Sequence, residues 1–205
     1  MKSKKIALIL IPLNLILVYF IYNSIQSEVD FNRDAKEHIA ENVQKLKDLR
    51  ALQIAYKRTH AAYANNFDSL LHFFEHDSIA IVRAEGETPD SLTDVQAIEL
   101  GIILRDTAFL PAKENVFDDI YLKSRNEKYP LDLNNLTTIP NTKKQYTVDA
   151  GMIEKGKVIV QVFEIGVAYR DVFSGLDAEN KKYDLEKILK VGSMDEASLN
   201  GNWGE

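Results

Sequence analysis

The stretch with the clearest chemical potential reads HFFEH and runs from His72 to His76. Two histidines four residues apart project from the same side of a helix, so both rings can bind one zinc ion. Glu75 precedes the second histidine, where its carboxylate can activate a zinc-bound water molecule. This residue order is that of the inverted zinc-hydrolase motif, which also requires a third protein ligand and a cleft. The pattern makes His72, Glu75 and His76 candidate residues of a zinc-dependent hydrolase.

The same stretch is also consistent with a short amphipathic helix. In that interpretation Leu70, Phe73 and Phe74 face a hydrophobic core, and both histidines face water. No downstream carboxylate stands out as a third ligand, and a motif of five residues without its structural context carries little information. We therefore favour the amphipathic helix, and we expect neither a bound metal nor another cofactor.

Other catalytic motifs are missing from the sequence. The chain has no cysteine, which excludes disulfides, thiolate metal sites, thiol catalysis and an N-terminal lipoprotein anchor. The segment FSGL at 173–176 is not a Gly-x-Ser-x-Gly nucleophile turn, and GKVIV at 156–160 lacks the glycine spacing of a phosphate-binding loop. A formal net charge of -6 opposes binding to a phosphate backbone, so we expect no nucleic-acid partner.

The first thirty residues predict a membrane anchor. Three lysines in MKSKK precede an uncharged, mostly apolar run from Ile6 to Tyr22, and a helix extended to Ile25 is long enough to span a bilayer. A cleaved signal peptide is the alternative, but no small-x-small cleavage site follows the run, which exceeds the usual signal core. We therefore expect a transmembrane helix at 6–25. Because lysines precede this segment and acidic residues follow it, the positive-inside rule places residues 1–5 in the cytoplasm and the remaining chain outside it.

A long amphipathic stem helix is predicted at 26–64. Apolar residues recur there at three- and four-residue steps, with a phase slip between Leu46 and Leu49, and opposite charges four residues apart lie on the wet side. We favour a helix that docks on its own head over a coiled coil that pairs with another subunit. Asn65 and Asn66 are expected to end this helix, because asparagine accepts capping conformations. The stripe consists of Ala35, Ile39, Val43, Leu46, Leu49, Leu52, Tyr56 and Tyr63.

The remaining chain predicts a small α+β head at 65–190 and a polar tail at 191–205, with Trp203 as the anchor of the tail. Strands that follow one another through turns, with helices set irregularly between them, indicate a mainly antiparallel sheet. The strongest signal is a hairpin at 145–165 that turns at 154–157. We expect helices at 68–75 and 183–190, a strand at 78–86 and an extended segment at 102–117. A further helix is expected within 88–101, with Ser91 or Thr93 as its cap and Gly101 as its end.

Two resemblances add to this interpretation. The order of apolar start, stem helix and the segment 48–74 resembles pilins and pseudopilins, although the start of the chain lacks the prepilin peptidase site. Over most of its length, including PDSLTDVQAIELGIILRDT, EKGKVIVQVFE and LKVGSMDEASLNGNW, the chain resembles an uncharacterised single-span membrane family of the Bacteroidota. The second resemblance implies a lineage and no particular activity.

Four short triplets are similar to the O-glycosylation acceptor of that lineage. In each, an Asp-Ser or Asp-Thr pair precedes an aliphatic or similar residue, which makes Ser69, Ser78, Ser91 and Thr107 candidate acceptors. The same pairs are ordinary helix caps, so Ser69 and Ser91 at predicted helix starts are less accessible than Ser78 and Thr107. Modification of the last two is therefore preferred.

The sequence as a whole predicts a non-catalytic, single-pass protein of the cytoplasmic membrane with its head in the periplasm. Its expected role is structural: the head binds another envelope component or further copies of the same chain. A zinc-dependent hydrolase that uses the HFFEH motif is one alternative. A periplasmic sensor or ligand-binding head is the other, and no residue of the chain separates it from the favoured role.

Overall fold

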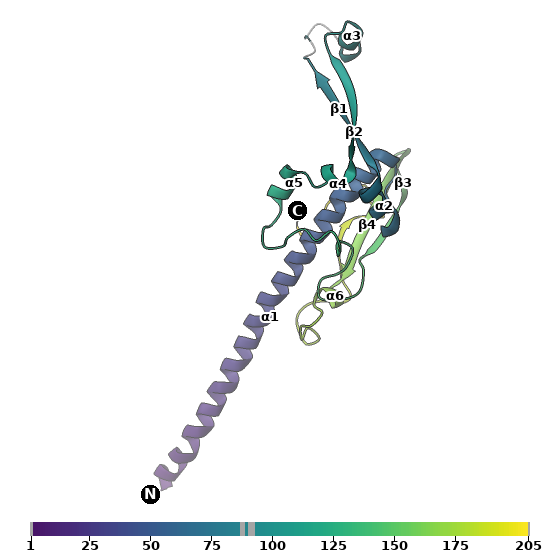
Figure 1. Ribbon diagram of the computed structural model, residues 1–205. Coiled ribbons are helices and arrows are strands. Elements are labelled where there is room, and N and C mark those ends of the chain that lie inside the picture. Colours follow the sequence, from purple (N-terminus) through teal and green to yellow (C-terminus); the bar gives the residue numbers. More distant parts are fainter. Residues whose placement is uncertain (1, 87–88, 90–92, 205) are drawn as a thin grey trace.

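The computed structural model describes residues 2–86, 89 and 93–204, and within these ranges the side chains of 2–9, 11, 82–85, 99, 104 and 105 are not described. The chain combines helices with two antiparallel sheets, which confirms the α+β class (Figure 1). The helices are α1 (Lys2–His60), α2 (Phe67–His76), α3 (Asp94–Glu99), α4 (Ala112–Asn115), α5 (Asp119–Ser124) and α6 (Tyr169–Val172). The strands are β1 (Ser78–Glu85), β2 (Leu104–Pro111), β3 (Thr147–Lys155), β4 (Val158–Ala168) and β5 (Ile188–Gly192).

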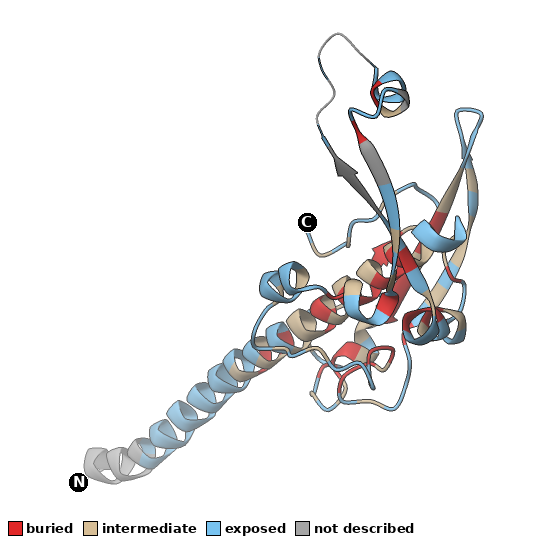
Figure 2. Cartoon of the chain, turned by 45° about the horizontal axis from the view of Figure 1, so that its top comes forward, coloured by how far each residue is buried: buried red, intermediate tan, exposed pale blue. Residues whose placement is uncertain are grey.

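Helix α1 is one continuous helix of 59 residues with two different environments. Its residues 12–29 project away from the body and are exposed, whereas its C-terminal turns are enclosed by the rest of the chain (Figure 2). The predicted apolar stripe supplies the buried side: Leu46, Leu49 and Leu52 are each 0% exposed. The docking of this helix on its own head is thereby confirmed. Because the stripe is buried within one chain, it does not offer a free seam for a coiled coil.

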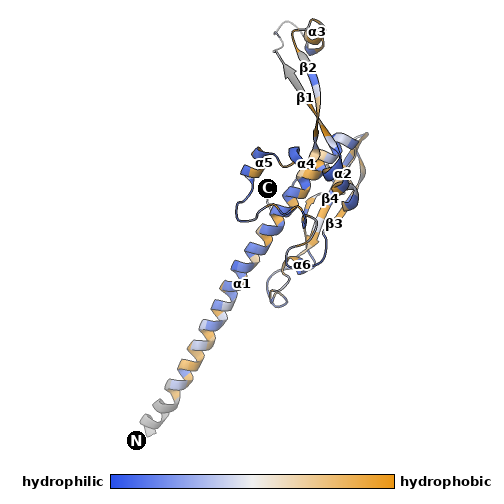
Figure 3. Cartoon of the chain, viewed as in Figure 1, coloured by the Kyte–Doolittle hydropathy of each residue, from blue (hydrophilic) through white to orange (hydrophobic). Residues whose placement is uncertain are grey.

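The N-terminal part of α1 is apolar and uncovered. Every side chain from Leu15 to Tyr22 is an exposed large hydrophobic one, and Figure 3 shows the hydrophobic colouring of this part of the helix. Within the described residues, however, none of the helices meets the length and apolarity needed to cross a membrane. Residues 6–9 and 11 of the predicted span have no described side chains. The transmembrane helix at 6–25 thus stays a prediction.

The end of α1 differs from the prediction. The helix ends at His60, and Ala61 takes a left-handed conformation with φ 59°, whereas Asn66 caps the next helix by accepting a hydrogen bond from the Ser69 amide. The buried Gln53 side chain explains the early end, because it exchanges two hydrogen bonds with the backbone of Ala64, at 2.8 and 2.9 Å. This contact folds the chain back onto α1 before the asparagines are reached.

The main sheet has the order β3-β4-β5 and packs on the C-terminal half of α1. The predicted hairpin is confirmed, with Gly156 and Lys157 in left-handed conformations at its turn. The helix predicted at 183–190 is wrong: a turn at Asp184 leads into β5, which pairs with β4 from Ile188 onward. Backbone pairing with β4 overrides the local helical pattern there. The predicted role of Trp203 is confirmed, since its ring packs against the core.

Strands β1 and β2 form a separate two-stranded ribbon that projects from the body and carries α3 near its far end (Figure 1). The strand predicted at 78–86 is confirmed, and the segment predicted as extended at 102–117 contains β2 followed by the short α4. Thr93 caps α3 in a capping box with Gln96, as one of the two caps expected for this helix. Ile79 at the base of β1 is 8% exposed and belongs to the core, whereas Phe109 on β2 is 71% exposed, so the described body of the protein covers the base of the ribbon and leaves Phe109 open.

Replacement of Leu49 by alanine should show how strongly the head depends on α1. Leu49 is fully buried, so we expect Leu49→Ala to lower the free energy of unfolding by about 2–5 kcal/mol, measured by denaturant titration. Leu122→Ala is the matched control, because the same atoms are removed from a side chain that is 42% exposed. Equal effects of the two substitutions would show that α1 is not the centre of the core.

Candidate functional site

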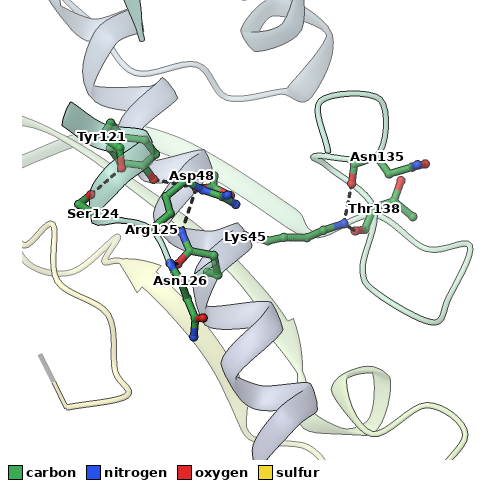
Figure 4. A network of polar contacts seen from close by, with 9 residues as sticks. Lys45, Asp48, Tyr121, Ser124, Arg125, Asn126, Asn135 and Thr138 are labelled. Atoms are coloured by element: carbon green, nitrogen blue, oxygen red, sulfur yellow. Dashed lines mark hydrogen bonds and ion pairs between the residues drawn. The ribbon is translucent and has the colours of Figure 1, made fainter. Parts of the chain in front are cut away.

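The most elaborate polar cluster lies where α1 meets α5, around the carboxylate of Asp48 (Figure 4). The guanidinium of Arg125 donates two hydrogen bonds to this carboxylate, from Nε at 2.9 Å and from an Nη atom at 2.7 Å. The Tyr121 hydroxyl donates a third at 2.8 Å, and the Gln44 amide donates a fourth at 3.1 Å. The Asp48 and Arg125 side chains are 1% and 7% exposed. This is a buried, fork-like ion pair with its acceptor oxygens in use.

The protonation of this cluster follows from its surroundings. Hydrogen bonding to Asp48 raises the pKa of Arg125, so the guanidinium stays charged. Burial, followed by the charge of Asp48, raises the pKa of the Tyr121 hydroxyl well above its usual value. That phenol therefore remains a hydrogen-bond donor at neutral pH and does not act as a base. The stabilisation that the Tyr121 hydroxyl gives is complete below the pKa of tyrosine in the unfolded chain. It is lost as the pH rises through the raised pKa that Tyr121 has in the folded protein.

A second cation extends the cluster along α1. Lys45 donates hydrogen bonds to the carbonyl oxygens of Asn135 and Thr138, at 2.7 and 2.8 Å, and burial lowers the pKa of its ammonium (Figure 4). The backbone amide of Asn126 donates to the Gln44 side chain at 3.2 Å. These contacts fasten the irregular segment 126–146 to α1. The arrangement is a structural clamp, because each of these polar groups already has a partner within the chain.

Next to the clamp lies an open groove with a volume of about 540 Å³. One wall is a single stripe of α1, and the other runs from the end of α4 through α5 to Arg125. The groove is lined by Gln44, Lys47, Arg50, Ala51, Ile54, Ala55, Arg58, Ile79, Asn115, Val116, Asp118, Tyr121, Ser124 and Arg125. Four of these side chains are cationic and one is anionic. The chemistry available in the groove is therefore the binding of negative charge.

The HFFEH motif lies on the outer face of α2. Leu70, Phe73 and Phe74 are buried, which confirms the predicted core face, whereas His72 and His76 are exposed with ring centres 4.8 Å apart. Within the described residues, no group of three or more histidine, aspartate or glutamate side chains is placed to hold a metal ion. The zinc site thus stays a prediction that has gained no third ligand from the fold.

The candidate glycosylation residues separate into two places. Ser78 and Thr107 are both exposed and lie within the β1–β2 ribbon, whereas Ser69 is half-buried in the first turn of α2. Ser91 lies outside the described residues. The cap of α2 is Asn66, so the Ser69 hydroxyl is not the capping group. Modification of Ser78 and Thr107 stays a prediction.

Comparisons with protein-family models, with curated proteins and with solved structures found no match to this chain. The two resemblances drawn from the sequence therefore stay predictions.

The clamp and the groove are the features that sequence reasoning missed. One signal was present: Asn42 and Gln53 continue the spacing of the apolar stripe on α1, yet both are polar, and both are fully buried. Polar residues at core positions indicate specific partners. Tyr146 is the partner of Asn42, at 2.7 Å across 104 positions of sequence. Periodicity on one helix could mark such positions but could not name their partners.

Breaking the ion pair from one side should destabilise the protein strongly. We expect Arg125→Met to lower the free energy of unfolding by about 3–5 kcal/mol, because it leaves the Asp48 carboxylate buried without its cation. Lys128→Met is the control, since it breaks an ion pair with Glu37 whose two side chains are 55% and 50% exposed, and little change is expected. Denaturant unfolding measures both. If Arg125→Met behaved like the control, the clamp would not hold α5 on α1.

Proposed function

We propose that this protein is a non-catalytic, membrane-anchored envelope protein whose α+β head binds another component of the envelope or further copies of the chain. The single observation that carries the proposal is the uncovered apolar segment of α1 between Leu15 and Tyr22. A helix that is apolar on all sides is stable only when another apolar phase surrounds it. A lipid bilayer supplies such a phase.

The charges at the two ends of this segment support an orientation. Lysines at positions 2, 4 and 5 precede it, and Glu28 and Asp30 follow it. The positive-inside rule then favours a cytoplasmic N-terminus and a head on the outer side of the cytoplasmic membrane. An ion pair between Glu28 and Lys181, at 2.7 Å, joins the head to α1 six residues beyond Tyr22. The proposed span would therefore lead directly into the folded head.

The orientation can be tested with a reporter fused after Glu205. We expect a reporter that is active only outside the cytoplasm to be active in this fusion, because the positive-inside rule places the head there. The matched control removes the positive charges before the segment. Replacing Lys2, Lys4 and Lys5 by glutamine should lower the reporter activity, because the positive-inside rule depends on these charges. Activity of a cytoplasm-only reporter in the same position would overturn the proposed orientation.

A binding role for the head is supported by the shape of the β1–β2 ribbon. Two-stranded ribbons are marginally stable on their own, and in the described part of the chain no third strand pairs with this one. Among its described side chains, Ile81 and Phe109 are large, apolar and exposed, and Val95, Leu100 and Ile102 are exposed in and next to α3. A partner that covered these side chains would stabilise the ribbon. The main polar cluster, in contrast, is saturated and offers no reactive group.

Site-specific photo-crosslinking can locate the contact. A photoreactive phenylalanine at position 109 should give a discrete crosslinked product in native membranes, because Phe109 is the most exposed aromatic side chain of the ribbon. The same probe at Ile120, which is 79% exposed on α5, is the control and should give less product. Mass spectrometry of the product would distinguish a second copy of the chain from another protein. Equal, diffuse labelling from both positions would contradict a docking role for the ribbon.

A further inference from the structure

We propose that the groove between α1 and α5 is a binding site for a small anion, a carboxylate or phosphate carried on a short apolar group. This site touches the ribbon only at the base of β1, through Ile79, and gives the head a ligand-binding function in addition to its proposed docking role. The inference rests on three properties of the groove: its charge, its apolar floor and the rigidity of its walls.

The charge of the groove is opposite to that of the whole protein. Lys47, Arg50, Arg58 and Arg125 line it, against the single carboxylate of Asp118, in a chain with a net charge of -6. Two acidic groups nearby are engaged: Asp48 accepts the fork of Arg125, and Asp118 caps α5 by accepting a hydrogen bond from the Tyr121 amide at 2.7 Å. The side chains that line the groove therefore carry a net positive charge.

Arg58 is the cation best placed to receive a ligand. It lines the groove on the last turns of α1 and is exposed, and within the described residues it makes no hydrogen bond or ion pair. Lys47 lies three turns earlier on the same side of the helix, and Arg50 also donates a hydrogen bond to the Leu199 carbonyl at 3.1 Å. Guanidinium groups match carboxylate and phosphate oxygens in geometry as well as in charge.

The apolar floor of the groove consists of the apolar residues of its lining. These are Ala51, Ile54 and Ala55 of α1, together with Ile79 and Val116. A volume of about 540 Å³ falls within the range of small-molecule sites, which combine apolar walls with a few polar groups that orient the ligand. A bare inorganic anion would leave this floor in contact with water. A ligand with an apolar body beside its acidic group uses both parts of the lining.

The walls of the groove are held in place before any ligand binds. Arg125 lies in the α5 wall and is fixed to Asp48 of α1 by the buried ion pair, and Tyr121 adds a hydrogen bond to the same carboxylate. A preformed site does not have to order its walls at the moment of binding, so more of the interaction energy appears as affinity. The clamp and the groove are thus parts of one arrangement.

The test is a calorimetric titration of the full chain, held in phosphatidylcholine nanodiscs, with phenyl phosphate at low salt. We expect saturable binding that weakens as ionic strength rises, because the cations are partly exposed. Arg58→Gln should weaken the affinity about five- to tenfold, because it removes a charge-assisted contact. Lys36→Gln is the matched control, since it removes a positive charge from an exposed position of α1 outside the groove.

Two further arms define the ligand. Inorganic phosphate should bind more weakly than phenyl phosphate, because it leaves the apolar floor empty. Nanodiscs that contain phosphatidic acid should compete with phenyl phosphate only if the anion is a lipid head group, whereas unchanged affinity would assign the site to a soluble anion.

Ala51→Leu should abolish binding by filling the groove, with thermal unfolding as the check that the head remains folded. Absence of binding by the wild-type chain, or equal affinity of Arg58→Gln and Lys36→Gln, would overturn the proposal.

Discussion

The buried carboxylate of Asp48 is the point on which the arrangement of the head depends. A charge in a nearly dry environment is tolerated only when it is paired and fully hydrogen-bonded, and Arg125 and Tyr121 meet that requirement from a segment more than seventy positions away. The region from α4 to β3 has little regular structure of its own, so the backbone hydrogen bonds of helices and sheets do little to fix its position. Lys45 adds to the same effect by binding two carbonyl oxygens of this region. The ion pair thus converts a long irregular segment into one wall of a groove.

Helix α1 carries both Asp48 and Lys45, so these contacts all attach the chain to one helix. The same helix that buries Leu46, Leu49 and Leu52 in the core continues without interruption to the apolar N-terminal segment. Pro12 is the one proline within it, and the side chain of Asn14 is satisfied inside the helix by the Leu10 carbonyl at 2.8 Å. Because a helix rises about 1.5 Å per residue, the distance from Ile25 to the groove at Lys47 is about 33 Å. With the proposed anchor, the groove would stand well away from the membrane surface.

The polar groups of the clamp are directed at one another. Tyr121 and Arg125 are held in their protonated forms and point at a carboxylate that already accepts four hydrogen bonds. The histidines of α2, in contrast, are exposed and stand on the outer face of a helix whose buried side chains build the core. The groove and the ribbon differ from these groups: the groove lining has a net positive charge, and the ribbon has exposed apolar side chains. Both are suited to recognising something outside the chain.

The sequence by itself determined the features that depend on near neighbours. The apolar stripe of α1, the core face of α2, the β3–β4 hairpin and the α+β class were all predicted, because helical and strand periods are written over a few residues. The tertiary structure decided what depends on distant partners. It ended α1 at His60 through Gln53, turned the predicted helix at 183–190 into β5 and paired Asp48 with Arg125. Local patterns could not foresee these outcomes, since each depends on a hydrogen-bond partner that only folding brings within about 3 Å.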